Sequence, residues 1–539
     1  MANHGKPEVS PSPPAPLPEG EGRQRLVERQ TKKYQETSRL DDAVVIGSGP
    51  NGLAAALTLA QAGWRVRILE AQARPGGALY SLETTLPGYI HDVGAAFFPF
   101  GQVSPAFQHF RLADVGLEWR GGVYESAHPA LDGTCPTVAR DVDRAAATFG
   151  ADADAWRWFA GWQAEMGQRL GEMLLTPLWE PGPAWRLGFM NLLRLGIAGV
   201  RSAAGYANGL FTTEAAQRVI PALSLHGDIG PDDFGGAAIG VVLALLAAGD
   251  GFQVPAGGAR SITHALLKRI EQHGGQLHLS SRVESIVVKQ HRAVAVRTEG
   301  GDEIPFAKAV LADVGAPALY FKLLPDRCVS GWVRQSMRAF RYGWGTFKMD
   351  WALAGPVPWL AEPARQAAVV HTGENMDDLR TFTGEARTGQ LPTNPYLVIG
   401  QQSLLDATRA PAGGHTLWAY SHVPSQMPGG WEKHREEFAD RIEARIEGLA
   451  PGFRTLIRDR AIFAPSDLER MNENLVGGDL GGGSAQFSHQ FFWRPVFPYF
   501  RYRTPVEGAY LCSASALPGP GVHGACGFNA ANAALADCE

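Results

Sequence analysis

Residues 41–71 read DDAVVIGSGPNGLAAALTLAQAGWRVRILEA, and this stretch decides the fold. The apolar residues 44–46 predict a short buried strand, and the alanine-rich run that follows predicts a helix. Three glycines with the spacing G-x-G-x-x-G join the two elements: Gly47, Gly49 and Gly52. Such glycines allow a tight turn, let the backbone approach a pyrophosphate at the helix N-terminus, and let the helix pack closely on the strand. The stretch therefore predicts a Rossmann-type dinucleotide site.

A second strand, predicted over residues 65–69, ends in Glu70. An acid about 20 residues after the glycines can accept hydrogen bonds from both ribose hydroxyls. The alternative is a glycine-rich turn without a ligand, but strand, helix, second strand and acid all coincide. The residues assigned to the cofactor from this stretch are Gly47, Ser48, Gly49, Pro50, Asn51, Gly52, Glu70 and Ala71. The pattern does not distinguish NAD from FAD.

A second glycine pair follows the ribose acid in the sequence Arg74-Pro75-Gly76-Gly77-Ala78. A glycine pair here suits a loop that passes close to a phosphate, and a plain surface turn is the alternative. Arg74, Gly76, Gly77 and Ala78 are therefore added to the predicted cofactor site.

Composition and charge exclude several classes of protein. The 539 residues are 45% hydrophobic and 19% charged, which is typical of a globular protein. The formal net charge of −5 provides no field that attracts a phosphate backbone, so we expect no nucleic-acid partner. The five cysteines form no C-x-x-C pair and no metal motif is found, so we expect no metal and a reducing compartment such as the cytoplasm.

The rest of the chain divides by composition. Residues 1–40 are rich in proline and charge, and we predict a disordered tail. The apolar run 235–248 is too short to span a membrane and predicts a buried helix. For the apolar run 187–200, a core helix is favoured over one that dips into a membrane. An amphipathic helix is predicted by a stripe with three- and four-residue spacing: Ala155, Phe159, Trp162, Met166, Leu170 and Met173.

Three blocks of the sequence resemble the phytoene desaturase-like FAD oxidoreductases, a family that includes carotenoid desaturases, isomerases and ketolases and the animal pyridine nucleotide-disulfide oxidoreductase domain-containing protein 2. The first block is the glycine stretch with RPGGALYS and PGYIHDVGAAFFP. The second is GFQVPAGGARSITHALLKRIEQHGGQLHLSSRVESIVV, and the third is TPVEGAYLCSASALPGPGVHGACGFNAANAAL. The resemblance runs from about residue 42 to the C-terminus.

The resemblance implies FAD as the cofactor. It implies that the backbone of Val283 contacts the adenine, and that the loop Gly521, Val522 and His523 lies beside the isoalloxazine ring before a helix that starts near Phe528. We therefore predict an α/β fold with a discontinuous Rossmann-type FAD-binding domain and an inserted substrate domain of helices and a mixed sheet. The FAD-binding domain takes residues 41–100, 253–315 and 473–539, and the substrate domain takes 101–252 and 316–472.

Two residues are candidates for catalysis. His523 lies in the flavin loop and could sit near the reacting carbon, although a lone histidine is more often structural. Lys348 lies on an alternating strand, in the place where the distantly similar flavin amine oxidases hold a water with a lysine, and a solvated strand lysine is the favoured alternative. Cys526 is interpreted as a small buried residue rather than a covalent flavin anchor.

The tryptophan-rich regions between the FAD segments suit a large apolar substrate. We therefore predict an FAD-dependent oxidoreductase that desaturates, oxidises or isomerises an apolar, polyene or carotenoid-like molecule. A peripheral membrane contact fits such a substrate. The alternatives are a flavin amine oxidase and a flavin-binding regulatory or interaction protein without turnover. The sequence leaves the oligomeric state open.

Overall fold

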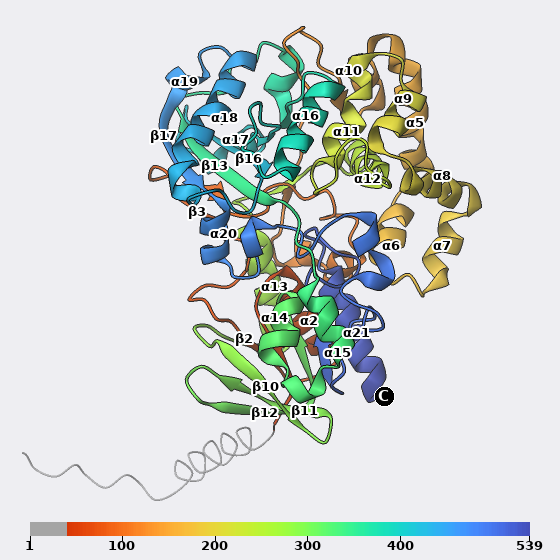
Figure 1. Ribbon diagram of the computed structural model, residues 1–539, viewed down its shortest axis with the longest axis vertical. Coiled ribbons are helices and arrows are strands. Elements are labelled where there is room, and N and C mark those ends of the chain that lie inside the picture. Colours follow the sequence, from red (N-terminus) through yellow and green to blue (C-terminus); the bar gives the residue numbers. More distant parts are fainter. Residues whose placement is uncertain (1–39) are drawn as a thin grey trace, which may run out of the picture.

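The computed structural model describes residues 40–539 and contains two seven-stranded sheets, one at each end of the molecule (Figure 1). The predicted tail, apart from its last residue, lies outside the described residues. Two short two-stranded sheets complete the strands, one of them formed by β3 (Ser81–Leu82) and β4 (His91–Asp92). The fold is therefore mixed α/β, as predicted.

The first sheet has the strand order β10–β11–β12–β1–β2–β9, and β18 pairs with β12. Its parallel part consists of β1 (Asp41–Ile46), β2 (Val66–Leu69), β9 (Gln276–His278), the end of β12 (Glu303–Ala312) and β18 (Ala509–Leu511). The antiparallel strands β10 (Val283–Lys289) and β11 (Arg292–Thr298) extend one edge. The sheet thus draws on three separated parts of the chain, and the discontinuous Rossmann-type architecture is confirmed.

Helix α2 (Pro50–Gln61) connects β1 to β2, and a proline occupies its first turn, where no backbone N–H is needed. Its alanines and leucines are buried against the sheet, against α13 (Arg260–Gln272) and against α21 (Ala525–Cys538). Because parallel strands end at the same edge, the glycine turn after β1 and the acid after β2 lie at one edge of the sheet.

The second sheet has the order β17–β13–β16–β15–β14–β6–β7. Its strands are β17 (Ile457–Phe463), β13 (Gly345–Leu353), β16 (His415–Val423), β15 (Val398–Gly400), β14 (Ala367–His371), β6 (Tyr124–Ala127) and β7 (Thr137–Val138). Helix α18 (Arg435–Leu449) packs on one face. The other face packs against helices and lines the cavity described below.

The helices beside the second sheet include the predicted buried helix, α12 (Ala237–Ala248). The predicted amphipathic helix is two helices, α5 (Ala153–Met166) and α6 (Arg169–Leu175), because Gly167 adopts a positive φ between them.

The expectation of a core helix over residues 187–200 is wrong. Helix α8 (Phe189–Val200) buries only Ala198, and the side chains of Phe189 and Met190 are 75% and 58% exposed. The apolar sequence was interpreted as a core helix, but in the structure no other element covers most of this helix.

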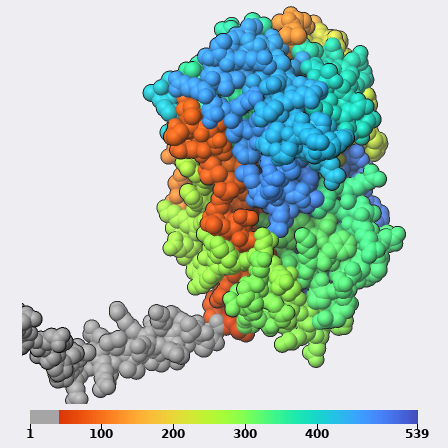
Figure 2. Space-filling view, turned by 60° about the vertical axis from the view of Figure 1, so that its left-hand side comes forward, coloured from red at the N-terminus to blue at the C-terminus, as the bar shows by residue number. Residues whose placement is uncertain are grey.

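The core of the first sheet also takes in residues of α3 (Pro105–Phe110) and α15 (Gly331–Arg338). These segments lie beyond the predicted boundaries at 100 and 315, and the division into domains stays a prediction. Figure 2 shows residues 40–100, coloured red to orange, running along the surface from the lower to the upper half of the molecule. This stretch therefore contacts both halves.

Candidate functional site: a dinucleotide cradle that opens into an apolar cavity

A cavity of about 1480 Å³ lies between the two sheets. Ligand pockets usually measure about 300–1,000 Å³, so this cavity has room for a cofactor and a second molecule. All the sequence-predicted site residues except Gly52 and Gly76 line it. Chain segments far apart in the sequence thus meet in one space.

The glycine turn after β1 is packed too tightly for side chains. A Cβ on Gly49 would lie 2.5 Å from Asp313 Oδ2, and a Cβ on Gly52 would lie 2.3 Å from the carbonyl oxygen of Gly47. Gly47 itself has a φ of +92°. Beside this turn, Asn51 Oδ1 is buried without a hydrogen-bond partner within residues 40–539. The turn therefore presents bare backbone and one unused acceptor at the N-terminus of α2, which suits a phosphate-bearing ligand with its own donors.

Glu70 is held at the edge of the cavity by the glycine turn. The backbone N–H and the hydroxyl of Ser48 donate to Glu70 Oε2 over 2.8 and 2.6 Å, and the N–H of Gln72 donates to Oε1 over 2.8 Å. The side chain is 7% exposed and lines the cavity. Oε2 already accepts two hydrogen bonds, but Oε1 accepts only one, so the group can still accept from a ribose hydroxyl.

Asp313 belongs to this site and was not predicted. It follows β12, and its Oδ2 accepts from the N–H of Gly52 over 2.8 Å. Burial raises the pKa of Asp313 to about 7, the Gly52 N–H opposes this rise, and Glu70 adds to it. The available signal was an acid directly after an apolar strand in AVLAD, at the carboxyl edge where ligands bind in such sheets.

The second glycine pair packs against the first. A Cβ on Gly77 would lie 2.9 Å from the Cα of Gly49, and the N–H of Gly76 donates to the carbonyl of Ser48 over 3.1 Å. Gly76 thus supports the turn from behind, whereas Gly77 and Ala78 face the cavity. Arg74 also lines the cavity, with its guanidinium 4.0 Å from the centre of the Tyr80 ring.

The loop 518–524 forms another part of the wall. Helix α21 begins at Ala525, so the prediction of a start near Phe528 is wrong. The helix includes Gly527 because it passes very close to α2: a Cβ there would lie 1.8 Å from the carbonyl oxygen of Asn51. Cys526 is fully buried, and burial raises its thiol pKa to about 12, as befits a core residue rather than a reactive one.

His523 is 1% exposed and is built into this loop. Its Nδ1 accepts from the N–H of Ala525 over 3.0 Å, and its ring meets that of Phe100 edge to face. Burial lowers the pKa of His523 to about 4. The imidazole is therefore neutral at physiological pH and carries its proton on Nε2.

Lys348 is not a solvated strand lysine, which was the favoured alternative at the level of sequence. It is 3% exposed in the middle of β13, and its Nζ lies 2.6 Å from both carboxylate oxygens of Asp350. Burial lowers the pKa of Lys348, and Asp350 opposes that shift. Lys348 and Asp350 thus form a buried ion pair in the wall of the cavity. Their alternating positions in the sequence place both side chains on the same face of β13.

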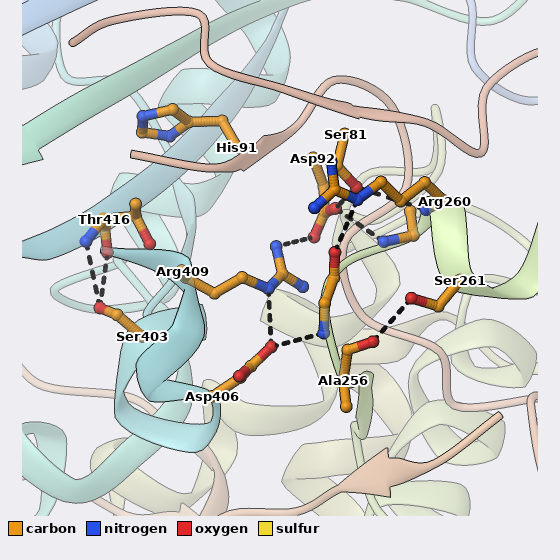
Figure 3. A network of polar contacts seen from close by, with 12 residues as sticks. Ser81, His91, Asp92, Ala256, Arg260, Ser261, Ser403, Asp406, Arg409 and Thr416 are labelled. Atoms are coloured by element: carbon orange, nitrogen blue, oxygen red, sulfur yellow. Dashed lines mark hydrogen bonds and ion pairs between the residues drawn. The ribbon is translucent and has the colours of Figure 1, made fainter. Parts of the chain in front are cut away.

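A buried ion network fastens the first half of the chain to the second (Figure 3). The guanidinium of Arg409 lies between the carboxylates of Asp92 and Asp406, at 2.9 and 3.1 Å. Asp92 also accepts from the N–H of Ala259 over 2.8 Å, and Asp406 accepts from the N–H of Gly257 over 2.8 Å. The network thereby holds three segments together: residues 92–94, the segment before α13 and the segment after α17 (Gln402–Leu405).

Comparison with known proteins identifies the class. The flavin containing amine oxidoreductase family matches residues 51–382, and the chain belongs to this family. The cofactor of this family is FAD, and the cradle described above fits it. Within the described residues, no helix is both long and apolar enough to cross a membrane.

Two kinds of curated protein are similar to this chain. A phytoene desaturase (neurosporene-forming) of Rhodobacter capsulatus is 26% identical over 520 residues, which cover 90% of this chain and 92% of that protein. Pyridine nucleotide-disulfide oxidoreductase domain-containing protein 2 of Rattus norvegicus is 28% identical, but the match spans about half the length of each protein, 52% and 51%. Among solved structures, an oxidoreductase from Methanosarcina mazei and a putrescine oxidase triple mutant have TM-scores of 0.60 and 0.59 at 14% and 16% identity, each covering 92% of this chain and 99% of the other. These structures share the fold.

Proposed function

We propose that this enzyme uses FAD to desaturate, oxidise or isomerise a large apolar molecule of polyene or carotenoid-like character. The observation that carries the proposal is the apolar part of the cavity, which continues from the glycine turns toward the second sheet. Its lining includes Phe97, Ile239, Val242, Phe252, Val398 and Trp418. Phytoene desaturases that align with nine-tenths of this chain support the same substrate class.

In this proposal FAD lies along the glycine turn. Glu70 binds the adenosine ribose, the bare backbone of Gly47 to Gly52 receives the pyrophosphate, and Val283 contacts the adenine. FAD supplies two-electron redox chemistry when it is bound. The loop Gly521 to His523 orients the reacting ring, and the apolar wall excludes water.

Lys348 has a positioning role in this proposal. Because Asp350 neutralises its ammonium, the wall carries no net charge from this pair, which favours an uncharged substrate. In an amine oxidase, by contrast, a lysine at this place would need free donors to hold a water. Nζ lies 2.6 Å from each oxygen of Asp350, so this pairing leaves at most one of the three ammonium donors for such a water.

An exposed apolar surface supports a peripheral contact with a lipid membrane. It consists of exposed side chains of α7 (Pro181–Leu187), α8 and the segment 487–497: Trp185, Phe189, Met190, Leu193, Phe491, Phe492 and Trp493. Phe487 and Phe491 also line the cavity. An apolar substrate could therefore pass from lipid into the cavity without crossing water.

The substrate class is tested by anaerobic mixing of the purified holoenzyme with a polyene such as phytoene, or with a panel of amines, while flavin absorbance is followed. We expect bleaching, or a changed polyene spectrum, with the polyene alone. Bleaching with an amine and hydrogen peroxide release in air would favour the amine oxidase, and a protein inert to both would favour the non-catalytic alternative.

The membrane contact is tested by flotation with phosphatidylcholine vesicles that contain anionic lipid. We expect the wild type to float and the double variant Phe189→Ser/Met190→Ser to remain in solution, because it loses two exposed apolar side chains. Leu131→Ser is a matched control, since Leu131 is 61% exposed in the loop before β7. Equal flotation of all three proteins would contradict the membrane contact.

A further inference from the structure

A chain of hydrogen-bonded polar side chains runs from the apolar cavity into the core beside the second sheet. The hydroxyl of Tyr420 lies 3.3 Å from His226 Nδ1, and His226 Nε2 lies 2.8 Å from His371 Nε2. From there His371 Nδ1 lies 2.9 Å from Ser126 Oγ, which lies 2.9 Å from His128 Nε2. Only the first two residues, Tyr420 and His226, line the cavity.

Strand pairing brings these residues together from distant parts of the sequence. Tyr420 on β16 is the register partner of Val398 on β15, and Val398 is the partner of His371 on β14. Next to β14 runs β6, which carries Ser126 and is followed directly by His128. His226 follows α11 (Val219–Ser224) and places its ring 5.0 Å from that of His371.

All three imidazoles are neutral. Burial lowers the pKa values of His128 and His226 to about 3 and lowers that of His371 well below its usual range. The buried Arg218, whose guanidinium donates to the His128 carbonyl over 2.9 Å, adds to the shift at His128. No group of three or more potential ligands within residues 40–539 could hold a metal ion, so a metal does not account for the cluster.

The hydrogen bonds along this row of neutral side chains can all point in either of two directions. One proton lies between the two Nε2 atoms, so each imidazole donates on one nitrogen and accepts on the other. In one direction the Tyr420 hydroxyl donates to His226, and its oxygen remains free to accept. In the other direction His226 donates to Tyr420, and the hydroxyl is free to donate. The cavity end can therefore either accept a hydrogen bond or donate one, without any change in net charge.

We propose that the Tyr420 hydroxyl, hydrogen-bonded to His226, binds one uncharged oxygen group, a hydroxyl or a carbonyl, on an otherwise apolar substrate. This inference rests on the proposed function and narrows its substrate class. Around the pair, the wall includes the apolar side chains of Trp418, Val398 and Ile239, and also His422, whose ring lies 5.5 Å from that of Tyr420. A pure hydrocarbon would leave the second hydrogen-bonding position of the Tyr420 hydroxyl empty, and a hydroxyl or carbonyl group would fill it.

The neighbouring charges favour an uncharged partner. Asp228 also lines the cavity, and its two oxygens already accept from the Ser484 hydroxyl and the Ala485 N–H, each over 2.6 Å. A substrate carboxylate would be repelled by Asp228. The cation of Lys348, one strand away from Tyr420, is already paired with Asp350.

The test compares four probes of one chain length: a C20 isoprenoid alcohol, its aldehyde, the hydrocarbon and the primary amine. Binding to the holoenzyme is followed by quenching of tryptophan fluorescence, since Trp418 lines the cavity. We expect the alcohol and the aldehyde to bind about tenfold more tightly than the hydrocarbon, which is the effect of one net hydrogen bond. Because this comparison uses only the wild-type protein, it does not depend on whether a variant folds.

The variant Tyr420→Phe should bind the alcohol and the hydrocarbon nearly equally while its affinity for the hydrocarbon is unchanged. His226→Gln should show a partial loss of the same preference. His415→Gln is the matched control, because His415 lies on the same strand, contacts Ser403 over 3.1 Å and does not line the cavity. In ¹⁵N spectra, the alcohol and the aldehyde should shift the imidazole resonances of His226 and His371 in different directions.

Three outcomes would overturn the inference. If the wild type bound the hydrocarbon and the alcohol equally, the inference that Tyr420 binds an oxygen group would be wrong, while the proposed apolar substrate class would still stand. If the amine bound most tightly, the site would recognise a cation rather than an uncharged group, and this would favour the amine oxidase alternative. If an FAD-loaded protein bound none of the four probes, the apolar substrate class itself would fail.

Discussion

At the scale of single residues, the cofactor site depends on two acids with different environments. Both acids are buried at the edge of the cavity, but Glu70 accepts three hydrogen bonds, whereas Asp313 accepts one, from the N–H of Gly52. Because an FAD pyrophosphate is anionic, an ionised Asp313 behind the glycine turn would repel it. The two acids therefore have opposite expected effects when they are replaced.

Glu70→Ala should weaken FAD binding by about tenfold or more, because the loss of a buried acceptor costs about 1–3 kcal/mol. Flavin retained after dilution and gel filtration measures the effect. Glu83→Ala is the control, since Glu83 is exposed on the surface. Full flavin occupancy in the Glu70 variant would show that this residue does not bind the ribose.

Asp313→Asn should remove a pH dependence of FAD affinity. The pKa of Asp313 is raised to about 7, so the protonated form prevails below that pH and the ionised form prevails above it. We expect wild-type FAD affinity to fall several-fold between pH 6 and pH 8 as the carboxylate forms near the pyrophosphate. The asparagine keeps an acceptor for the Gly52 N–H, and its affinity should stay flat over this range. If FAD affinity changed with pH in the same way in both proteins, Asp313 would not be the group that causes the pH dependence.

His523→Asn should lower turnover without changing the shape of the pH profile between pH 5 and pH 9. The pKa of about 4 keeps the imidazole neutral throughout this range, and its Nδ1 is already used as an acceptor. The residue then acts by placing the loop rather than by proton transfer. Loss of a limb near neutral pH in the variant would instead identify a general base.

At the scale of elements, the buried ion network connects strands and helices of different segments. Arg409 is fully buried, and its removal would leave Asp92 and Asp406 facing each other. Breaking such a network costs about 3–5 kcal/mol because a buried charge remains unpaired.

Arg409→Met should therefore lower the free energy of unfolding by about 3–5 kcal/mol in denaturant titrations. Arg380→Met is the control, because its pair with Asp232 is exposed and such pairs contribute about 0–1 kcal/mol. A loss in Arg409→Met no larger than in the control would mean that the network does not hold the elements together.

The same scale shows what the sequence could reveal. The strand, turn, helix and acid of residues 41–71 were predictable because every contact that defines them is local or follows a known spacing. The boundary of α21 was missed because glycine usually ends a helix, whereas Gly527 lies inside α21 to let it pass close to α2. For α8 the sequence predicts an apolar helix, but it contains no information on whether another element covers that helix.

The polar parts of the cavity could not be predicted for a different reason. Asp313, Arg409 and the pair Tyr420–His226 find their partners across hundreds of residues or across three strands, and no local pattern marks such a pairing. The register of the second sheet brings His371 beside Tyr420 and Ser126, and the turn after α11 adds His226.

At the scale of the whole molecule, residues 40–539 contain one dinucleotide cradle. The glycines at 477–483 follow no strand and form a loop around Asp479, so they build no second cradle. In the proposed function FAD takes this fingerprint, and a nicotinamide would then have little to orient it.

We therefore expect NADPH or NADH to reduce the flavin only slowly, and oxygen or a quinone to accept the electrons from the substrate. Anaerobic mixing of the oxidised holoenzyme with NADPH, followed by flavin absorbance, measures this. Saturable bleaching at a catalytically competent rate with micromolar nucleotide would contradict the expectation and indicate a reductase.

The pairing of β18 with β12 and of α21 with α2 has a consequence for biosynthesis. The glycine turn emerges from the ribosome early, but the helix that packs on it comes from residues 525–538, after more than 400 intervening residues have been translated. In the nascent chain, α2 must therefore remain without its partner α21 until late in translation. Cofactor added during synthesis would find a complete cradle only after residue 538 has left the exit tunnel.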